Sequence, residues 1–175
     1  MFDFHLQNVD ESFVSLKDFP EAKGFIIIFS CNHCPYVIGS EERIIALHQK
    51  YAPQGYPVIA ISSNDVLQFP DDSFENMKKK ATQKKFPFHY LYDESQEIAR
   101  NFGAERTPHV FLLQKDREGN LKQLYSGAID DNPKFASEMK VKYLEPVMEA
   151  LLSGKPLPFS TQPAIGCTIK WKAGN

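Results

Sequence analysis

The stretch that decides the fold reads GFIIIFSCNHCPYV and occupies residues 24–37. Gly24 to Phe29 is an unbroken apolar and β-branched run, typical of a central strand that is covered on both faces. After it the apolar residues follow a helical period as far as Tyr51, and Pro35 suits the first turn, where its missing N–H costs nothing. The stretch therefore predicts a strand, a turn that carries two cysteines, and a helix.

The rest of the chain continues this alternation. Residues 57–62 read as a second buried strand, so that the helix before them makes a βαβ crossover. The later elements that we expect are a helix over 72–85 capped by Asp72, a short strand over 88–92, a helix from the capping box at Asp93 to Gly103, a β-hairpin of 110–113 with 121–125, and a last helix over 141–152 started or kinked by Pro146. This order predicts an α/β fold with a mixed central sheet flanked by helices, in which an antiparallel edge joins a parallel core.

Length and composition favour one globular domain. The chain has 175 residues, of which 42% are hydrophobic and 24% charged, and this excludes disordered and collagen-like classes. The tail carries Pro156, Pro158 and Pro163 and shows no regular period. We therefore expect a single domain over 1–175, with a core over 1–152 and an irregular wrapping tail over 153–175.

Charge gives little support to a polyanionic partner. The 20 basic and 22 acidic side chains leave a net charge of −2, so we expect neither nucleic-acid nor membrane binding. The lysines at 78–80 read as the solvated face of a helix. The N-terminus lacks the basic start and apolar run of a signal peptide, and no stretch approaches the roughly 20 apolar residues of a membrane span. These features predict a cytoplasmic protein.

The C-x-x-C formed by Cys31 and Cys34 is the strongest chemical signal in the sequence. Two intervening residues allow both sulfurs to meet in disulfide geometry. A sulfur at a helix N-terminus is favoured as the thiolate, which is the attacking species in disulfide exchange. We expect Cys31 at that N-terminus as the more exposed, more acidic nucleophile, and Cys34 inside the first turn as the resolving thiol.

Three other uses of the cysteine pair are weaker. A zinc site needs two more ligands, and the sequence has no second C-x-x-C and no H-x3-H. Covalent haem attachment needs a histidine after the second cysteine, where Pro35 stands. A structural pair gains little in a reducing compartment. We therefore expect no metal and no organic cofactor.

Two motifs in combination resemble the thioredoxin superfamily, in its peroxiredoxin-like (redoxin) branch. They are FIIIFSCNHCPYV at 25–37 and TPHVFLL at 107–113, supported by the region of Gly127, and the resemblance extends from about Leu6 to Trp171. It implies a thioredoxin-like fold with an insertion after the second core strand, matched here by 65–88.

The resemblance also supplies a substrate contact. It implies that the Thr107–Pro108 peptide bond is cis and faces the cysteine pair, so that the backbone of Thr107 meets a peptide-like substrate. Without the resemblance, only about 5% of X–Pro bonds would be expected to be cis.

The sequence departs from its relatives at two points. Ser30 stands where thioredoxins commonly have a tryptophan before the first cysteine. The peroxidatic pattern Pro-x-x-x-Thr/Ser-x-x-Cys is absent, because the residues three positions before the two cysteines are Ile28 and Cys31. The missing hydroxyl makes peroxidase activity the weaker reading.

Three residues near the motifs have two readings each. His33 can donate a hydrogen bond or positive charge to the Cys31 thiolate, or be an exposed filler. Asn32 can tune the pair or simply tolerate the turn. His109, beside Pro108, is expected to pack, with proton transfer as the alternative.

Together these features predict a thiol–disulfide oxidoreductase that works through a mixed disulfide on Cys31 and Cys34. Its partners would be protein or small-molecule disulfides and dithiols. A peroxiredoxin-like thiol peroxidase with an antioxidant role and a redox-sensing binding module without turnover are the alternatives.

The third cysteine, Cys167, lies in the tail beside Ile169 and Trp171. Apolar residues in an irregular tail indicate docking on the body, and a cysteine among them is usually a small buried hydrophobe. We expect a structural role for Cys167, with a third redox thiol that relays electrons to Cys31 and Cys34 as the alternative.

Overall fold

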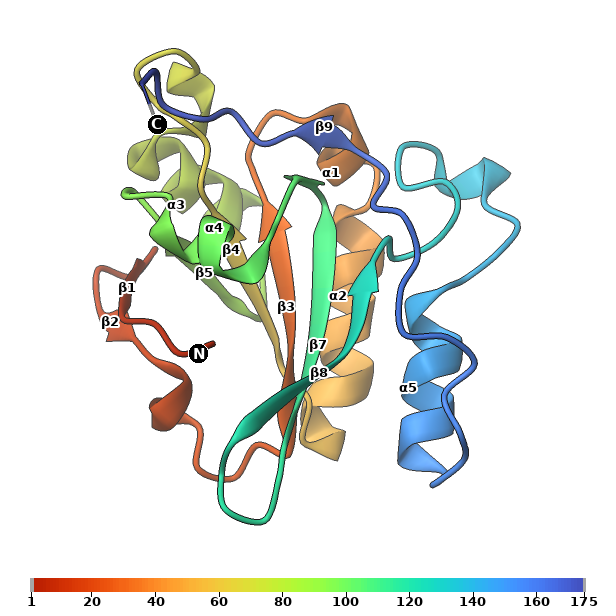
Figure 1. Ribbon diagram of the computed structural model, residues 1–175. Helices are drawn as coiled ribbons and strands as arrows, with labels where there is room; N and C mark the ends of the chain where they lie inside the picture. The colour runs from red at the N-terminus through yellow and green to blue at the C-terminus, as the bar shows by residue number, and fades with distance from the viewer. Residues whose placement is uncertain (1, 175) are drawn as a thin grey trace.

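The computed structural model describes residues 2–174, and a seven-stranded mixed sheet forms its centre in the order β2-β1-β5-β4-β3-β7-β8 (Figure 1). Strands β6 and β9 form a second, two-stranded sheet. The strands are β1 (Leu6–Asn8), β2 (Phe13–Val14), β3 (Gly24–Ser30), β4 (Val58–Ser62), β5 (His89–Tyr92), β6 (Arg106–Thr107), β7 (His109–Lys115), β8 (Leu121–Gly127) and β9 (Cys167–Thr168).

The predicted central strand is confirmed. All seven residues of β3 are buried, and the strand pairs in parallel with β4 and antiparallel with β7. The β7–β8 hairpin is also confirmed, with its turn at 116–120 closed by hydrogen bonds to Asp116. Because β3 lies between two strands, its carboxyl end is held firmly, and the cysteine-bearing turn begins there.

Helices cover both faces of the sheet. They are α1 (Pro35–Ile38), α2 (Glu41–Tyr51), α3 (Phe74–Gln83), α4 (Glu97–Phe102) and α5 (Leu144–Leu152), with short 3-10 turns at 16–18, 52–54, 70–72 and 136–138. Ile26 and Ile28 pack with α2, α3 and α5, whereas Phe25, Ile27 and Phe29 pack on the opposite face with α4 and the N-terminal segment. This alternation is the period of two that a strand imposes.

Two helix predictions need correction. The helix expected from Pro35 to Tyr51 is divided into α1 and α2 by a turn at Gly39. Only glycine fits this turn, because a Cβ at Gly39 would lie 2.1 Å from the carbonyl oxygen of Lys134. The last helix begins at Leu144 and not at Val141, whose side chain is exposed.

The cap of α3 is also different from the prediction. Ser73, not Asp72, is the N-cap, and its side chain accepts the N–H of Asn76. Asp72 is fully buried and points elsewhere. Local sequence spacing allowed either residue to cap the helix, and the contacts of Asp72 described below explain why it does not.

The sheet carries antiparallel strands at both edges, where the sequence predicted one. The additional edge is β1 and β2, a short N-terminal hairpin that pairs with β5. The parallel part is limited to β3, β4 and β5.

The tail leaves α5, runs back along the body and crosses the end of the sheet near α1 as β9 (Figure 1). Leu157 and Phe159 pack against one core cluster, and Ile169 is buried in the other. Docking of the tail is therefore confirmed. None of the helices within residues 2–174 is both long enough and apolar enough to cross a membrane.

Candidate active site

The two cysteines of the C-x-x-C occupy different backbone positions. Cys31 follows the last residue of β3, whereas Cys34 is the N-cap of α1, which begins at Pro35. Both are buried, at 1% and 0% exposure. The prediction that Cys31 lies at the helix N-terminus is therefore wrong, and the exposures of the two residues are too similar to distinguish them. Pro35 is the physical reason, because a proline at the first helical position leaves the cap to the residue before it.

The electrostatic environment also favours Cys34. A hydrogen bond from Cys31, others from Cys167 and the N–H of Val37 lower the pKa of the Cys34 thiol to about 4, against its burial. The pKa of Cys31 is raised by the same hydrogen bond to Cys34, by burial and by the negative charge of Asp72. These shifts favour Cys34 over Cys31 as the thiolate of the pair.

The Thr107–Pro108 peptide bond is cis and borders both cysteines, which confirms that prediction. The Thr107 carbonyl oxygen lies 3.4 Å from Cys34 Sγ, and the Thr107 hydroxyl lies 3.6 Å from Cys31 Sγ. Two segments that are more than 70 residues apart in sequence therefore form one site.

Cys167 is the third sulfur of this site. Its Sγ lies 2.6 Å from Cys34 Sγ, and the structure holds all three cysteines as free thiols. Cys167 is only partly buried, and with Tyr36 it packs over the cluster of Cys31, Cys34 and Val37. The expectation that Cys167 is buried is wrong, because its side chain is only partly covered where the tail brings its sulfur against Cys34, and its role stays a prediction.

Asp72 organises the turn between the two cysteines, and sequence analysis missed this role. Its fully buried carboxylate accepts the backbone N–H of Asn32 at 2.8 Å and the side-chain amide of Asn64 at 2.9 Å. Asn32 is itself buried, and it accepts the Tyr90 hydroxyl and donates to the carbonyl of Asp71. Asn32 is therefore a fixed part of the turn and no filler.

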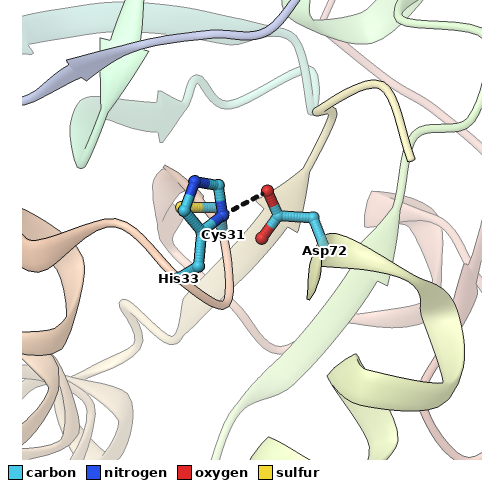
Figure 2. A group of neighbouring side chains, drawn as sticks. All are labelled: Cys31, His33 and Asp72. Carbon is cyan, nitrogen blue, oxygen red and sulfur yellow. Dashed lines mark ion pairs between the residues drawn. The ribbon is translucent and has the colours of Figure 1, made fainter. Parts of the chain in front are cut away.

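His33 also contacts Asp72. Its Nδ1 lies 2.7 Å from Asp72 Oδ2, and Figure 2 shows the two side chains meeting next to Cys31. The imidazole stacks on Phe69 at a centroid distance of 6.0 Å. His33 thus bridges the turn to the 65–88 insertion.

Cys31, His33 and Asp72 have potential metal-ligand atoms that all lie within 4.8 Å of one another. Both carboxylate oxygens of Asp72 already accept hydrogen bonds from Asn32 and Asn64. The group therefore reads as a hydrogen-bonded support for the turn.

His109 packs, as the sequence predicted. It is buried, its Nδ1 accepts the N–H of Glu105, and its Nε2 faces the hydroxyl of Ser126. Burial lowers its pKa to about 4, so the ring is neutral near pH 7. A neutral ring with both nitrogens engaged is a poor proton shuttle.

The fold and the site together define a thioredoxin-like protein: a strand, a C-x-x-C and a helix face a cis-proline. The AhpC/TSA family model matches residues 1–123, and the chain belongs to that family. It is a peroxiredoxin-like member of the thioredoxin superfamily. Membership supports a thiol oxidoreductase or thiol peroxidase activity in general terms. No curated protein matches the chain.

Solved structures give the same fold. An uncharacterized conserved protein from Geobacillus kaustophilus is 39% identical, with a TM-score of 0.89 over 100% of this chain and 95% of that one. The exposed lipoprotein thioredoxin of Streptococcus pneumoniae is 21% identical, with a TM-score of 0.55 over 69% of this chain and 87% of that one. The peroxidoxin BcpB of Mycobacterium tuberculosis is 18% identical, with a TM-score of 0.59 over 75% and 84%.

The lowered pKa of Cys34 gives a pH-dependent prediction. A pKa below the ordinary value of about 8.5 means that the thiolate persists as the pH falls, until the pH reaches the lowered pKa. The reduced protein should therefore show one thiolate by ultraviolet absorbance at about pH 6, where an ordinary cysteine is protonated. The signal should disappear in Cys34→Ser. Its absence from the wild type, or its survival in Cys34→Ser, would assign the acidic thiol elsewhere.

Proposed function

We propose that the protein is a thiol–disulfide oxidoreductase in which Cys34 is the nucleophile and Cys31 its partner in the C-x-x-C. The observation that carries the proposal is the position of Cys34 at the N-cap of α1, with its sulfur 3.4 Å from the backbone of the cis Thr107–Pro108 segment. The nucleophile proposed here is thus Cys34, where the sequence analysis expected Cys31.

The reaction has two exchange steps. The Cys34 thiolate attacks one sulfur of a substrate disulfide, a bond forms between them, and the other half of the substrate leaves as a thiolate. A second thiol of the protein then attacks the Cys34 sulfur of this mixed disulfide. The bond from Cys34 to the substrate breaks, the rest of the substrate leaves as a thiolate, and a disulfide between the two protein thiols remains. The substrate has gained two electrons, and an external dithiol returns them to the protein. No metal or organic cofactor takes part in these steps.

The neighbours of Cys34 have supporting roles in this proposal. Thr107 and Pro108 form the wall against which a disulfide substrate lies. Asn32 and His33, both held by Asp72, tune the pair by fixing the turn that carries the sulfurs. Thiols that must cycle through the reduced form fit the cytoplasm, which is the proposed location.

Thiol peroxidase activity is the second candidate, favoured by the match to the AhpC/TSA family and by the fold of BcpB. The position three residues before Cys34 carries Cys31 instead of a hydroxyl side chain. The pKa of Cys31 is raised, so this thiol can donate a hydrogen bond. A sulfur is nevertheless a weaker donor than a hydroxyl, and we rank peroxide reduction below disulfide exchange.

Two assays on the wild-type protein distinguish these functions. We expect catalysed reduction of insulin disulfides in the presence of dithiothreitol, and slow consumption of hydrogen peroxide with the same donor. Rapid peroxide turnover without insulin reduction would reverse the ranking. Reversible oxidation of the cysteines without turnover in either assay would favour a redox-sensing module.

A further inference from the structure

The tail presents Cys167 to the active site through β-sheet pairing. Strand β9 pairs antiparallel with β6, so that Cys167 lies opposite Thr107 and Thr168 opposite Arg106. The Arg106 guanidinium donates to the carbonyl of Gly166 at 2.9 Å, and the N–H of Ile169 donates to the carbonyl of Glu105 at 3.0 Å. The segment that borders Cys34 thus also fixes the position of Cys167.

The residues after β9 hold it firmly. The N–H of Lys170 donates to Asn64, and its carbonyl accepts from the N–H of Asp65 and the side chain of Gln96. Ile169 is 3% exposed. The tail is docked in one register, because the backbone of Lys170 is hydrogen-bonded to the body and the side chain of Ile169 is buried in it.

Gly166 permits the close approach of β9. A Cβ at this position would lie 2.0 Å from the carbonyl oxygen of Thr107. Any other residue would therefore push the tail away from the segment that borders Cys34. The backbone is fitted to this contact immediately before the cysteine.

The sulfur of Cys167 is the tail atom that reaches the nucleophile. At 2.6 Å, the Cys167 and Cys34 sulfurs are already close to the length of a disulfide bond, about 2.05 Å. Only a small shift is needed to join them. Cys167 is also the most exposed of the three cysteines, since it is only partly buried whereas Cys31 and Cys34 are both buried.

Charge distinguishes Cys167 from Cys31 as the resolving thiol. Burial and the neighbouring Cys34 raise the pKa of Cys167 to about 11, whereas Lys170 and Arg106 act to lower it. When Cys34 enters a mixed disulfide its negative charge is lost, and the two basic residues remain. Cys31 keeps the unfavourable charge of Asp72 at that stage. The thiolate then forms more readily on Cys167.

We infer that Cys167, held by β9, is the resolving thiol and that oxidation joins Cys34 to Cys167. This inference rests on the proposed function. The Cys167 thiolate attacks the Cys34 sulfur of the mixed disulfide, a Cys34–Cys167 bond forms, and the bond from Cys34 to the substrate breaks. The substrate leaves as a thiolate and takes up the proton that Cys167 lost. An external dithiol then reduces the Cys34–Cys167 disulfide.

Peptide mapping of the oxidised protein tests this inference. The reduced protein is oxidised with glutathione disulfide, quenched with acid and an alkylating agent, and digested with trypsin without reduction. Cys31 and Cys34 remain together in residues 24–43, and Cys167 lies in residues 143–170, because Pro156 blocks cleavage after Lys155. We expect these two peptides to be cross-linked, and still cross-linked in Cys31→Ser. A disulfide confined to residues 24–43 would overturn the inference.

Variants of the tail supply the kinetic test. In Cys167→Ser we expect a Cys34–substrate mixed disulfide to accumulate and insulin turnover to fall about tenfold or more. Gly166→Ala keeps all three cysteines but displaces β9, and it should lower cross-linking and turnover in the same direction. Thr168→Ser, an exposed change on the same strand, is the matched control and should retain wild-type turnover. Circular dichroism and thermal melting verify that each variant is folded.

The outcomes separate the inference from the function on which it rests. If Cys167→Ser turns over at the wild-type rate while Cys34→Ser is inactive, the function stands and Cys31 is the resolving thiol. If Cys34→Ser remains active, the proposed nucleophile itself is wrong.

Discussion

Replacing Cys34 by serine is expected to lower insulin-reductase turnover by about 1,000-fold or more. The reason is chemical, since a serine hydroxyl at this position cannot attack a disulfide and does not ionise near neutral pH. Helix α1 would retain a residue that caps well, so the fold should persist. Initial rates with dithiothreitol as donor measure the effect.

The matched variant is Cys31→Ser. Its hydroxyl can still donate a hydrogen bond to the Cys34 thiolate, so we expect a loss of no more than about tenfold. The opposite pattern, an inactive Cys31→Ser beside an active Cys34→Ser, would restore the assignment that the sequence suggested.

Asp72→Asn is expected to lower the free energy of unfolding by about 2–4 kcal/mol. The carboxylate is fully buried and accepts from Asn32 and Asn64, while His33 lies 2.7 Å away. An asparagine keeps one acceptor oxygen but places its amide donors against the amide of Asn64. One buried donor pair would then face another without an acceptor. Urea denaturation monitored by circular dichroism measures the change.

Asp71→Asn is the control for this prediction, because Asp71 is adjacent in sequence and its side chain is exposed. A change within about 0.5 kcal/mol is expected for it. Equal effects of the two substitutions would show that the buried contacts of Asp72 do not stabilise the turn.

Local patterns predicted the elements that surround the site. The apolar run before Cys31 gave the central strand because a strand buried on both faces has no polar positions. The start of α1 could also have been predicted from the sequence, since a proline at the first helical position makes the residue before it, Cys34, the N-cap. The sequence interpretation placed the helix N-terminus at Cys31, and it therefore assigned the nucleophile to Cys31, where we propose Cys34.

Contacts across long sequence separations were beyond local reasoning. Asp72 lies 40 residues after Asn32, and its nearest sequence signal was that of a helix cap. Cys167 lies 133 residues after Cys34, and only the pairing of β9 with β6 brings their sulfurs together. The β1–β2 hairpin was not predicted, because its strands have three and two residues, too few to show the alternation of apolar and polar residues that indicates a strand.

The measurement that tests the central claim most directly is the mass of the adduct formed by a variant in which Cys34 is the sole cysteine. The reduced Cys31→Ser/Cys167→Ser protein is mixed with glutathione disulfide, quenched with acid and analysed intact and after digestion. If Cys34 is the nucleophile, one glutathione is bound to residues 24–43 and remains, because no second thiol can release it. An unmodified protein, together with adduct formation in a variant that retains only Cys31, would contradict the account.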